Sequence, residues 1–243
     1  MKQSVFITVL LVAATAISVV IYEYLLPQFI KDGGFLVVAL MVLTIMVTTF
    51  IIERLFSLRK AQGKGPLTVF IRNVQQAINT GNIDAAIKAC DQQRGSCANI
   101  LRTGLERYKV LVEQGDIKGQ KEVMDEVQHA IEEAMMLEVP LLERNLIALS
   151  TIASISTMVG LLGTVLGMIR SFQALAHAGA PDAVQLSIGI SEALINTAGG
   201  LIAAIAGILA YNYFVTKVDN FTYMIDEASY SIVQSLVLKQ RKK

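Results

Sequence analysis

Long apolar runs constrain this sequence more than any other feature. Four stretches are almost free of charge: residues 5–26, 35–52, 146–169 and 188–215. A helix needs about 20 apolar residues to cross a bilayer. Only 17% of the residues are charged, whereas soluble domains carry about 25%. The sequence therefore predicts an all-α membrane protein with three or four transmembrane helices, whose long helices extend into a cytoplasmic helical bundle.

The first run has two readings. Lys2 followed by an apolar stretch is also typical of a signal peptide. The run, however, continues to Leu26 and lacks a clean small-x-small cleavage site. We favour a retained membrane anchor over residues 1–26, and a cleaved signal stays as the alternative.

Composition argues against several other classes of protein. The net charge of +1 gives no global basic field for nucleic acid, so we expect no nucleic-acid partner. A zinc site needs four ligands, but besides Cys90 and Cys97 the chain has only His129 and His177. We expect reduced, unligated thiols, no metal and no cofactor. The sequence contains no Walker-type nucleotide-binding motif, and no catalytic set of nucleophile, base and acid can be assembled from it. We therefore do not expect the chain to be an enzyme.

The basic residues predict how the chain is oriented in the membrane. Thirteen Lys and Arg residues lie between Glu53 and Ile147. The tail ends on Lys239, Arg241, Lys242 and Lys243, which also suit anionic lipid headgroups. The stretch 171–187 has no Lys or Arg, and 27–34 has only Lys31. The positive-inside rule then places the middle segment and the C-terminus in the cytoplasm.

Turn signals and breaker-free stretches divide the chain further. No strong breaker except Pro140 lies between Gly119 and Ser171, which predicts one long helix, kinked at Pro140. The last helix is expected to run unbroken from Ile208 to the tail. The expected parts are an anchor span plus a second span (1–56), a cytoplasmic helical segment (57–147), a pore-lining span (148–172), a short outer loop (173–187), a second pore-lining span (188–215) and a cytoplasmic C-terminal helix with a basic tail (216–243).

Small polar residues follow one face of the third span. They recur at helical spacing, at Ser150, Ser154, Thr157, Thr164 and Ser171. Gly160, Gly163 and Gly167 lie beside this hydroxyl stripe and allow close helix contact. Tight helix packing alone is the simpler interpretation of such serines and glycines.

The fourth span repeats this pattern and adds a carboxylate. One face carries Gly189, Glu192, Asn196, Gly199, Ala203 and Gly207, with Thr197 on its flank and Gly200 as a further helix-contact candidate. A carboxylate inside a span is costly and normally marks a pathway, so Glu192 is the principal candidate. The hydroxyls do not titrate near neutral pH, and Glu192 lies toward the outside. If protons move here, a second protein is expected to supply the mid-membrane carboxylate.

Two long motifs resemble one known family. The segments TIASISTMVGLLGTVLGMIRSF (151–172) and GISEALINTAGGLIAAIAG (189–207), followed by Tyr211-Asn212, are similar to the ExbB/TolQ/MotA proton-channel family, with ExbB as the nearest branch. The resemblance covers 150–215 tightly and 35–238 loosely. Asn196 and Gly199 depart from the usual small or aliphatic residues, and the extra N-terminal span departs from the usual three-helix plan.

The resemblance implies a subunit of the bacterial inner membrane. Five copies would surround two single-pass helices of an ExbD-like partner, whose membrane aspartate would face Thr164 and Thr197. Glu192 falls on the family's pore glutamate, and Ser154, Thr157 and Asn196 support the pore face. Proton flow would pass work to a TonB-like protein and to outer-membrane transport.

Two other functions compete with this one. The first is a sibling machine, either a TolQ-like envelope-constriction subunit or a MotA-like motor stator. The second is a non-conducting membrane scaffold, in which the polar stripes only pack helices. The residues alone do not separate protons from sodium, and the family resemblance favours protons.

Overall fold

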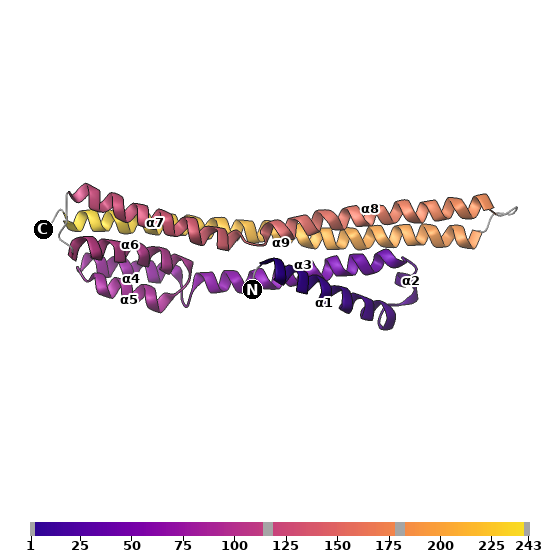
Figure 1. Cartoon of the computed structure of the whole chain (residues 1–243), viewed down its shortest axis with the longest axis horizontal. Helices are drawn as coiled ribbons and strands as arrows, with labels where there is room; N and C mark the ends of the chain where they lie inside the picture. Colours follow the sequence, from indigo (N-terminus) through magenta and orange to yellow (C-terminus); the bar gives the residue numbers. More distant parts are fainter. Residues whose placement is uncertain (1–2, 114–118, 178–182, 241–243) are drawn as a thin grey trace. The chain divides into compact units, whose positions relative to one another are not determined.

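The computed structural model describes residues 3–113, 119–177 and 183–240. Within these residues the chain is α-helical without a strand (Figure 1). The helices are α1 (Gln3–Tyr24), α2 (Gln28–Lys31), α3 (Phe35–Gln62), α4 (Leu67–Asn79), α5 (Ile83–Gln93), α6 (Ser96–Glu113), α7 (Gln120–Glu143), α8 (Leu146–His177) and α9 (Ala183–Gln240). Four helical stretches of the described residues are long and apolar enough to cross a membrane. The predicted all-α membrane fold class is confirmed.

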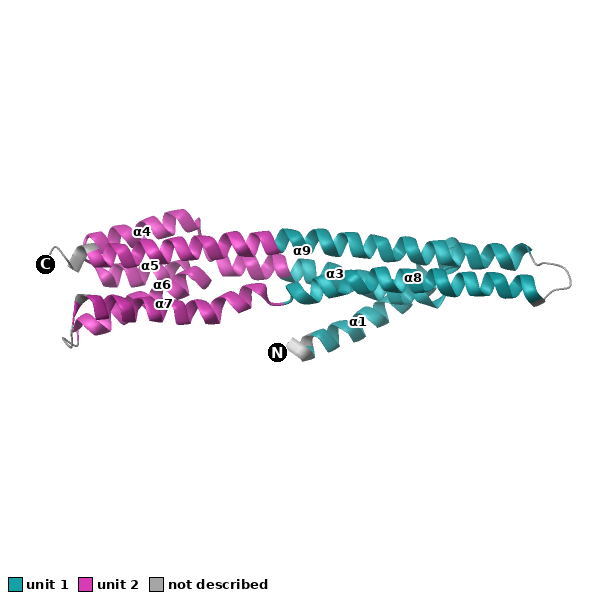
Figure 2. Ribbon diagram, turned by 90° about the horizontal axis from the view of Figure 1, so that it is seen from above, with its two compact units in different colours: residues 1–53, 145–214 teal, residues 54–144, 215–243 magenta. Residues whose placement is uncertain are grey.

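The chain divides into two compact units, coloured separately in Figure 2. Unit 1 contains residues 1–53 and 145–214, and unit 2 contains residues 54–144 and 215–243. Helices α3 and α9 contribute residues to both units. The apolar runs of the sequence lie in unit 1, and most of the charged middle segment lies in unit 2.

Unit 1 is held together by close packing of small residues between α8 and α9. A Cβ added at Gly200 would lie 2.6 Å from the carbonyl oxygen of Ser156 and 2.8 Å from the Cα of Gly160. A Cβ added at Gly207 would lie 2.8 Å from the Cβ atom of Ala153. Since real Cβ atoms do not approach so closely, the two backbones meet only because these positions are glycine. Gly200 and Gly207 of α9 therefore pack directly on α8.

Unit 2 is a helical bundle with an apolar interior. On α4 the side chains of Phe70, Val74 and Ile78 recur every four residues and are buried, as an amphipathic helix requires. Helix α5 begins where Asn82 Oδ1 accepts a hydrogen bond from the Ala85 amide at 2.9 Å, an N-cap. A hydrogen bond of 2.6 Å from Gln75 Nε2 to Ser231 Oγ ties α4 to α9.

The predicted single helix from Gly119 to Ser171 is wrong. Helix α7 ends at Glu143 and α8 begins at Leu146, whereas Pro140 lies inside α7. Asn145 has φ +68°, a left-handed conformation that asparagine tolerates better than most residues. Its Nδ2 donates a hydrogen bond to Glu53 Oε2 at 3.2 Å.

A cap on α7 accompanies this break. The Leu142 carbonyl accepts a hydrogen bond of 2.9 Å from Nη1 of Arg54, which is 1% exposed. The break is thus fixed by side chains about 90 residues earlier in the sequence.

Helix α9 is continuous from Ala183 to Gln240, which confirms the unbroken last helix predicted beyond Ile208. The expected outer loop over 173–187 is helical at both ends, because α8 extends through 173–177 and α9 covers 183–187. The rest of that loop, 178–182, lies outside the described residues. The membrane boundaries expected at 172 and 188 stay predictions.

Candidate functional site

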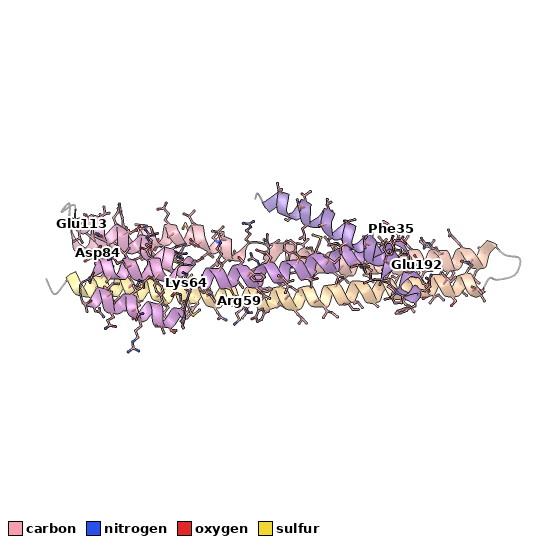
Figure 3. All side chains as sticks on the ribbon, turned by 90° about the horizontal axis from the view of Figure 1, so that it is seen from below. Phe35, Arg59, Lys64, Asp84, Glu113 and Glu192 are labelled. Atoms are coloured by element: carbon pink, nitrogen blue, oxygen red, sulfur yellow. The ribbon has the colours of Figure 1, made fainter. Side chains whose placement is uncertain are left out.

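The candidate site is built around Glu192 on α9. Its side chain is buried, with 5% of the residue exposed. Figure 3 shows Glu192 near the end of α3 that begins at Phe35. Gly34, just before α3, has φ +71°, and a Cβ there would lie 2.8 Å from Glu192 Oε1. Only glycine leaves room for the carboxylate against this turn.

Arg170 on α8 forms an ion pair with Glu192. Its Nη1 atom lies 2.5 Å from Glu192 Oε1 and 2.6 Å from Oε2. The two partners differ in exposure, because 61% of the Arg170 side chain is accessible and only 6% of the Glu192 side chain is. The buried carboxylate is therefore paired with one cation whose own side chain is largely exposed in the single chain.

Sequence reasoning missed Arg170. The residue follows directly after the charge-free run 146–169, and Glu192 lies near the start of the run 188–215. Two consecutive spans joined by a short connection run in opposite directions, so the end of one lies beside the start of the other. Opposite charges at these two places were the signal that could have revealed the pair.

Asn196 lies one turn after Glu192 and is fully buried. Its Nδ2 donates a hydrogen bond of 2.8 Å to the Gly33 carbonyl. Its Oδ1 has no hydrogen-bond partner among the described residues. A Cβ at Gly163 would overlap the Asn196 side chain, so the asparagine occupies space that this glycine leaves on α8.

The two candidate threonines are placed differently. Thr197 lies at the contact between α8 and α9, where its hydroxyl is 3.3 Å from the Gly160 carbonyl and 3.1 Å from the Ala193 carbonyl. The Thr164 hydroxyl instead donates to the Leu161 carbonyl of its own helix, at 2.6 Å. Both side chains are partly exposed.

The supporting hydroxyls of α8 bond to their own backbone. Ser154 donates to the Ser150 carbonyl at 3.1 Å, and Thr157 lies 3.5 Å from the Ala153 carbonyl. Such bonds to a carbonyl four residues earlier satisfy the donor and leave the hydroxyl oxygen free to accept. Within the described part of the chain, neither hydroxyl forms a hydrogen bond with Glu192 or Arg170.

The candidate helix-contact glycines face two different neighbours. Gly160, Gly163, Gly167 and Gly200 lie where α8 and α9 meet. For example, a Cβ at Gly167 would lie 2.8 Å from the Ala193 amide nitrogen. Gly199 faces α3 instead, where a Cβ would lie 3.3 Å from Leu40 Cδ1.

The cysteines lie in unit 2, on α5 and α6. Cys90 is 2% exposed and Cys97 is 1% exposed. Burial raises the pKa of each thiol to about 12. Since the thiolate is the nucleophile and the metal ligand, these buried thiols are suited to neither role. Among the described residues, no group of three His, Cys, Asp or Glu side chains could hold a metal ion.

Comparison with known proteins identifies a family. Residues 92–227 match the MotA/TolQ/ExbB proton channel family, which is more than half of the chain.

Individual relatives match over shorter segments. The chain is 39% identical over 118 residues to the Tol-Pal system protein TolQ of Pseudomonas aeruginosa, covering 49% of this chain and 51% of TolQ. It is 44% identical over 91 residues to the putative biopolymer transport protein ExbB-like 3 of Synechocystis, covering 37% of this chain and 43% of the relative. It is 37% identical over 93 residues to the biopolymer transport protein ExbB of Salmonella typhimurium, covering 38% and 37%. The matched segments thus span about half, or less, of these relatives' lengths.

Proposed function

Because the chain belongs to the MotA/TolQ/ExbB proton channel family, we propose that it is a proton-channel subunit of the bacterial inner membrane, acting with a single-span partner. The burial of Glu192 within the apolar part of α9 carries this proposal. A carboxylate inside a membrane span usually faces a pathway or a partner. The hydroxyls of Thr164 and Thr197, together with Ser154, Thr157 and Asn196, supply further polar atoms to α8 and α9.

The partner supplies the proton-carrying group. In the two proposed pore-lining spans, residues 148–172 and 188–215, Glu192 is the sole carboxylate. Hydroxyl and amide groups relay hydrogen bonds but do not titrate near neutral pH. We therefore assign the mid-membrane carboxylate to an ExbD-like single-span protein, whose aspartate faces Thr164 and Thr197 in a ring of copies of this chain, with a pentamer as the expected ring.

Two processes are candidates for the work that proton flow performs: outer-membrane transport and envelope constriction. We favour an ExbB-like role, in which proton motive force energises a TonB-like protein and transport across the outer membrane. A TolQ-like role in envelope constriction is the second candidate, because the Pseudomonas aeruginosa relative is a Tol-Pal system protein. A neighbouring gene for an ExbD-like protein followed by one for a TonB-like protein would favour the uptake role.

Reconstitution tests the channel proposal. Purified chain is inserted into liposomes with and without its single-span partner, and proton entry is followed with a trapped pH-sensitive dye. We expect flux only when both proteins are present, and loss of that flux when the partner's membrane carboxylate is replaced by its amide. The matched variant Thr151→Val, on the exposed side of α8, should conduct normally.

Two outcomes would contradict the proposal. Proton flux through this chain alone that is lost on Glu192→Gln would place the proton carrier here and not on the partner. A complete complex that assembles yet conducts nothing would favour the membrane scaffold.

A further inference from the structure

The turn that follows α3, marked by Lys64 in Figure 3, borders a cavity of about 590 Å³ within unit 2. Three cationic side chains line this basic cavity: Lys60, Lys64 and Arg94. We propose that the basic cavity binds the phosphate group of an anionic phospholipid, in the leaflet where α3 leaves the membrane. The inference goes beyond the proposed function, because it concerns lipid binding and does not depend on proton conduction.

Two closely packed turns bring these cations together. Lys64 lies in the turn between α3 and α4, and Arg94 lies in the turn between α5 and α6. The Lys64 amide donates a hydrogen bond of 2.8 Å to the Gln93 carbonyl. The side-chain amide of Gln93, a residue that is 9% exposed, donates to the carbonyls of Gln62 and Gly65, each at 3.1 Å. The fold thus holds the three positive charges around one cavity.

These cations are not neutralised by acidic neighbours. Among the described residues, none of the three takes part in an ion pair. One carboxylate lines the same cavity, that of Glu138, and it accepts a hydrogen bond of 2.9 Å from Asn99 Nδ2. Three cations and one carboxylate leave the lining with a formal charge of +2. A cleft with such a surplus of one sign attracts ligands of the opposite sign.

Neutral donors beside the cations suit a phosphate group. The Ser57 hydroxyl lies on the cavity and accepts a hydrogen bond of 3.5 Å from Arg54 Nη2, which leaves its own proton for another acceptor. Gly95 and Ser96 line the cavity where the 18-residue helix α6 begins. The first amides of a helix have no acceptor within it and add to the attraction of cations for phosphate.

The place of the cavity along α3 favours a lipid over a free anion. Exposed apolar side chains of α3 continue as far as Leu55 and Phe56, which are 41% and 67% exposed, and the cavity begins at the next residue. Lys60 follows the charge-free run 35–52 by eight residues, which is about 12 Å of helix. A lysine side chain can reach back from there to the headgroups. On the wall, Leu141 is 56% exposed and offers apolar contact beside the charges. This combination fits a phosphate that carries apolar chains.

The test measures thermal unfolding of the full chain in neutral detergent, with phosphatidylglycerol or phosphatidylcholine titrated into the micelles. We expect phosphatidylglycerol to raise the unfolding temperature saturably and phosphatidylcholine to leave it unchanged. Lys60→Gln and Arg94→Gly should each weaken the apparent affinity for phosphatidylglycerol about fivefold, the effect of one cation near anionic headgroups. Arg94 has φ +56°, which glycine adopts readily, so Arg94→Gly should fold as well as wild type without lipid.

Arg59→Gln is the matched control. Arg59 is exposed on the same helix, one residue before Lys60, but it does not line the cavity. This variant should bind phosphatidylglycerol as wild type does. If it weakens binding as much as Lys60→Gln, the attraction is a diffuse surface effect and the proposal is wrong. An equal response to phosphatidylcholine would also overturn it. Inorganic phosphate that raises the unfolding temperature as far as phosphatidylglycerol would assign the cavity to a free anion and refute the lipid assignment.

Discussion

Thr197 is a residue whose hydroxyl lies at a helix contact and also belongs to the proposed pathway. Its hydroxyl reaches the Gly160 carbonyl across the contact between α8 and α9 and also the Ala193 carbonyl of its own helix. Both acceptors are backbone carbonyls, so the hydroxyl adds little that defines the fold. In the proposed pathway, we expect its polar atom to matter to a proton or to a partner's carboxylate more than to packing.

We predict that Thr197→Val and Thr164→Val each abolish proton-driven function and leave assembly intact. Valine has nearly the shape of threonine but removes the polar atom, so the cost in unfolding free energy should stay near about 1 kcal/mol. Proton flux and oligomer mass, measured on the same preparations, check this. Wild-type flux in both variants would contradict the role assigned to the two threonines.

The buried thiols predict a dependence of stability on alkaline pH. Burial raises the pKa of Cys90 and Cys97 from 9.0 to about 12. Below pH 9 both states keep the thiols protonated, so they contribute no pH dependence. Above it the unfolded chain loses the protons first, and stability falls as pH rises toward about 12, by up to about 1.4 kcal/mol per pH unit and thiol.

Denaturant unfolding of wild type and of Cys90→Ala and Cys97→Ala variants, across this alkaline range, checks the prediction. The variants are less stable at neutral pH because they leave cavities, but their stability should decline less steeply with pH. If stability declines equally steeply with pH in the variants and in wild type, the two thiols are not buried in the folded state and the prediction is wrong.

At the scale of elements, the contact between α8 and α9 depends on which glycine faces which helix. Gly199 and Gly200 are adjacent in the sequence but point to different neighbours. A Cβ at Gly200 would meet backbone atoms of Ser156 and Gly160, which cannot move aside independently of the helix. A Cβ at Gly199 would meet Leu40 Cδ1, the mobile end of a side chain, at 3.3 Å.

Gly200→Ala should therefore destabilise the protein by about 1–3 kcal/mol, as overpacking typically does. Gly199→Ala, the matched control, should cost less than about 1 kcal/mol, because alanine favours helix over glycine and offsets a small shift of Leu40. Thermal unfolding in detergent compares the two. A Gly199→Ala variant that is the less stable of the two would contradict the assigned helix faces.

At the scale of the whole molecule, the orientation in the membrane decides which segments face the cytoplasm. The positive-inside pattern predicts a cytoplasmic middle segment and C-terminus. The basic residues of α3, of α4 and of the turn between them include Arg59, Lys60, Lys64 and Arg72. They follow an apolar run and support the same orientation.

A reporter that is active only in the cytoplasm, fused after Lys243, should be active in cells. A periplasmic reporter at the same position should be inactive, and the reverse pattern would refute the orientation. Peptide mass mapping of protein extracted from membranes distinguishes the two readings of the first span, because a retained span keeps the peptides of residues 1–26 and a cleaved signal removes them.

The sequence by itself determined the features that follow from local patterns. Hydropathy over about 20 residues predicts the spans, and helical spacing predicts that Glu192, Asn196 and Gly207 lie on one face of α9. The absence of Gly and Pro beyond Ile208 predicts the continuous end of α9. These properties depend on neighbouring residues of one helix, so they can be read without a fold.

Only the tertiary structure decided which distant groups meet. Arg170 is 22 residues from Glu192, and the Gly33 carbonyl is 163 residues from Asn196. The break before α8 likewise depends on Asn145 meeting Glu53, 92 residues away. Hydrogen bonds and ion pairs act over about 3 Å, and no periodicity within one helix specifies a contact at that range with another. For this reason the sequence predicted a carboxylate in the membrane span, and only the structure identified Arg170 as the residue that pairs with it.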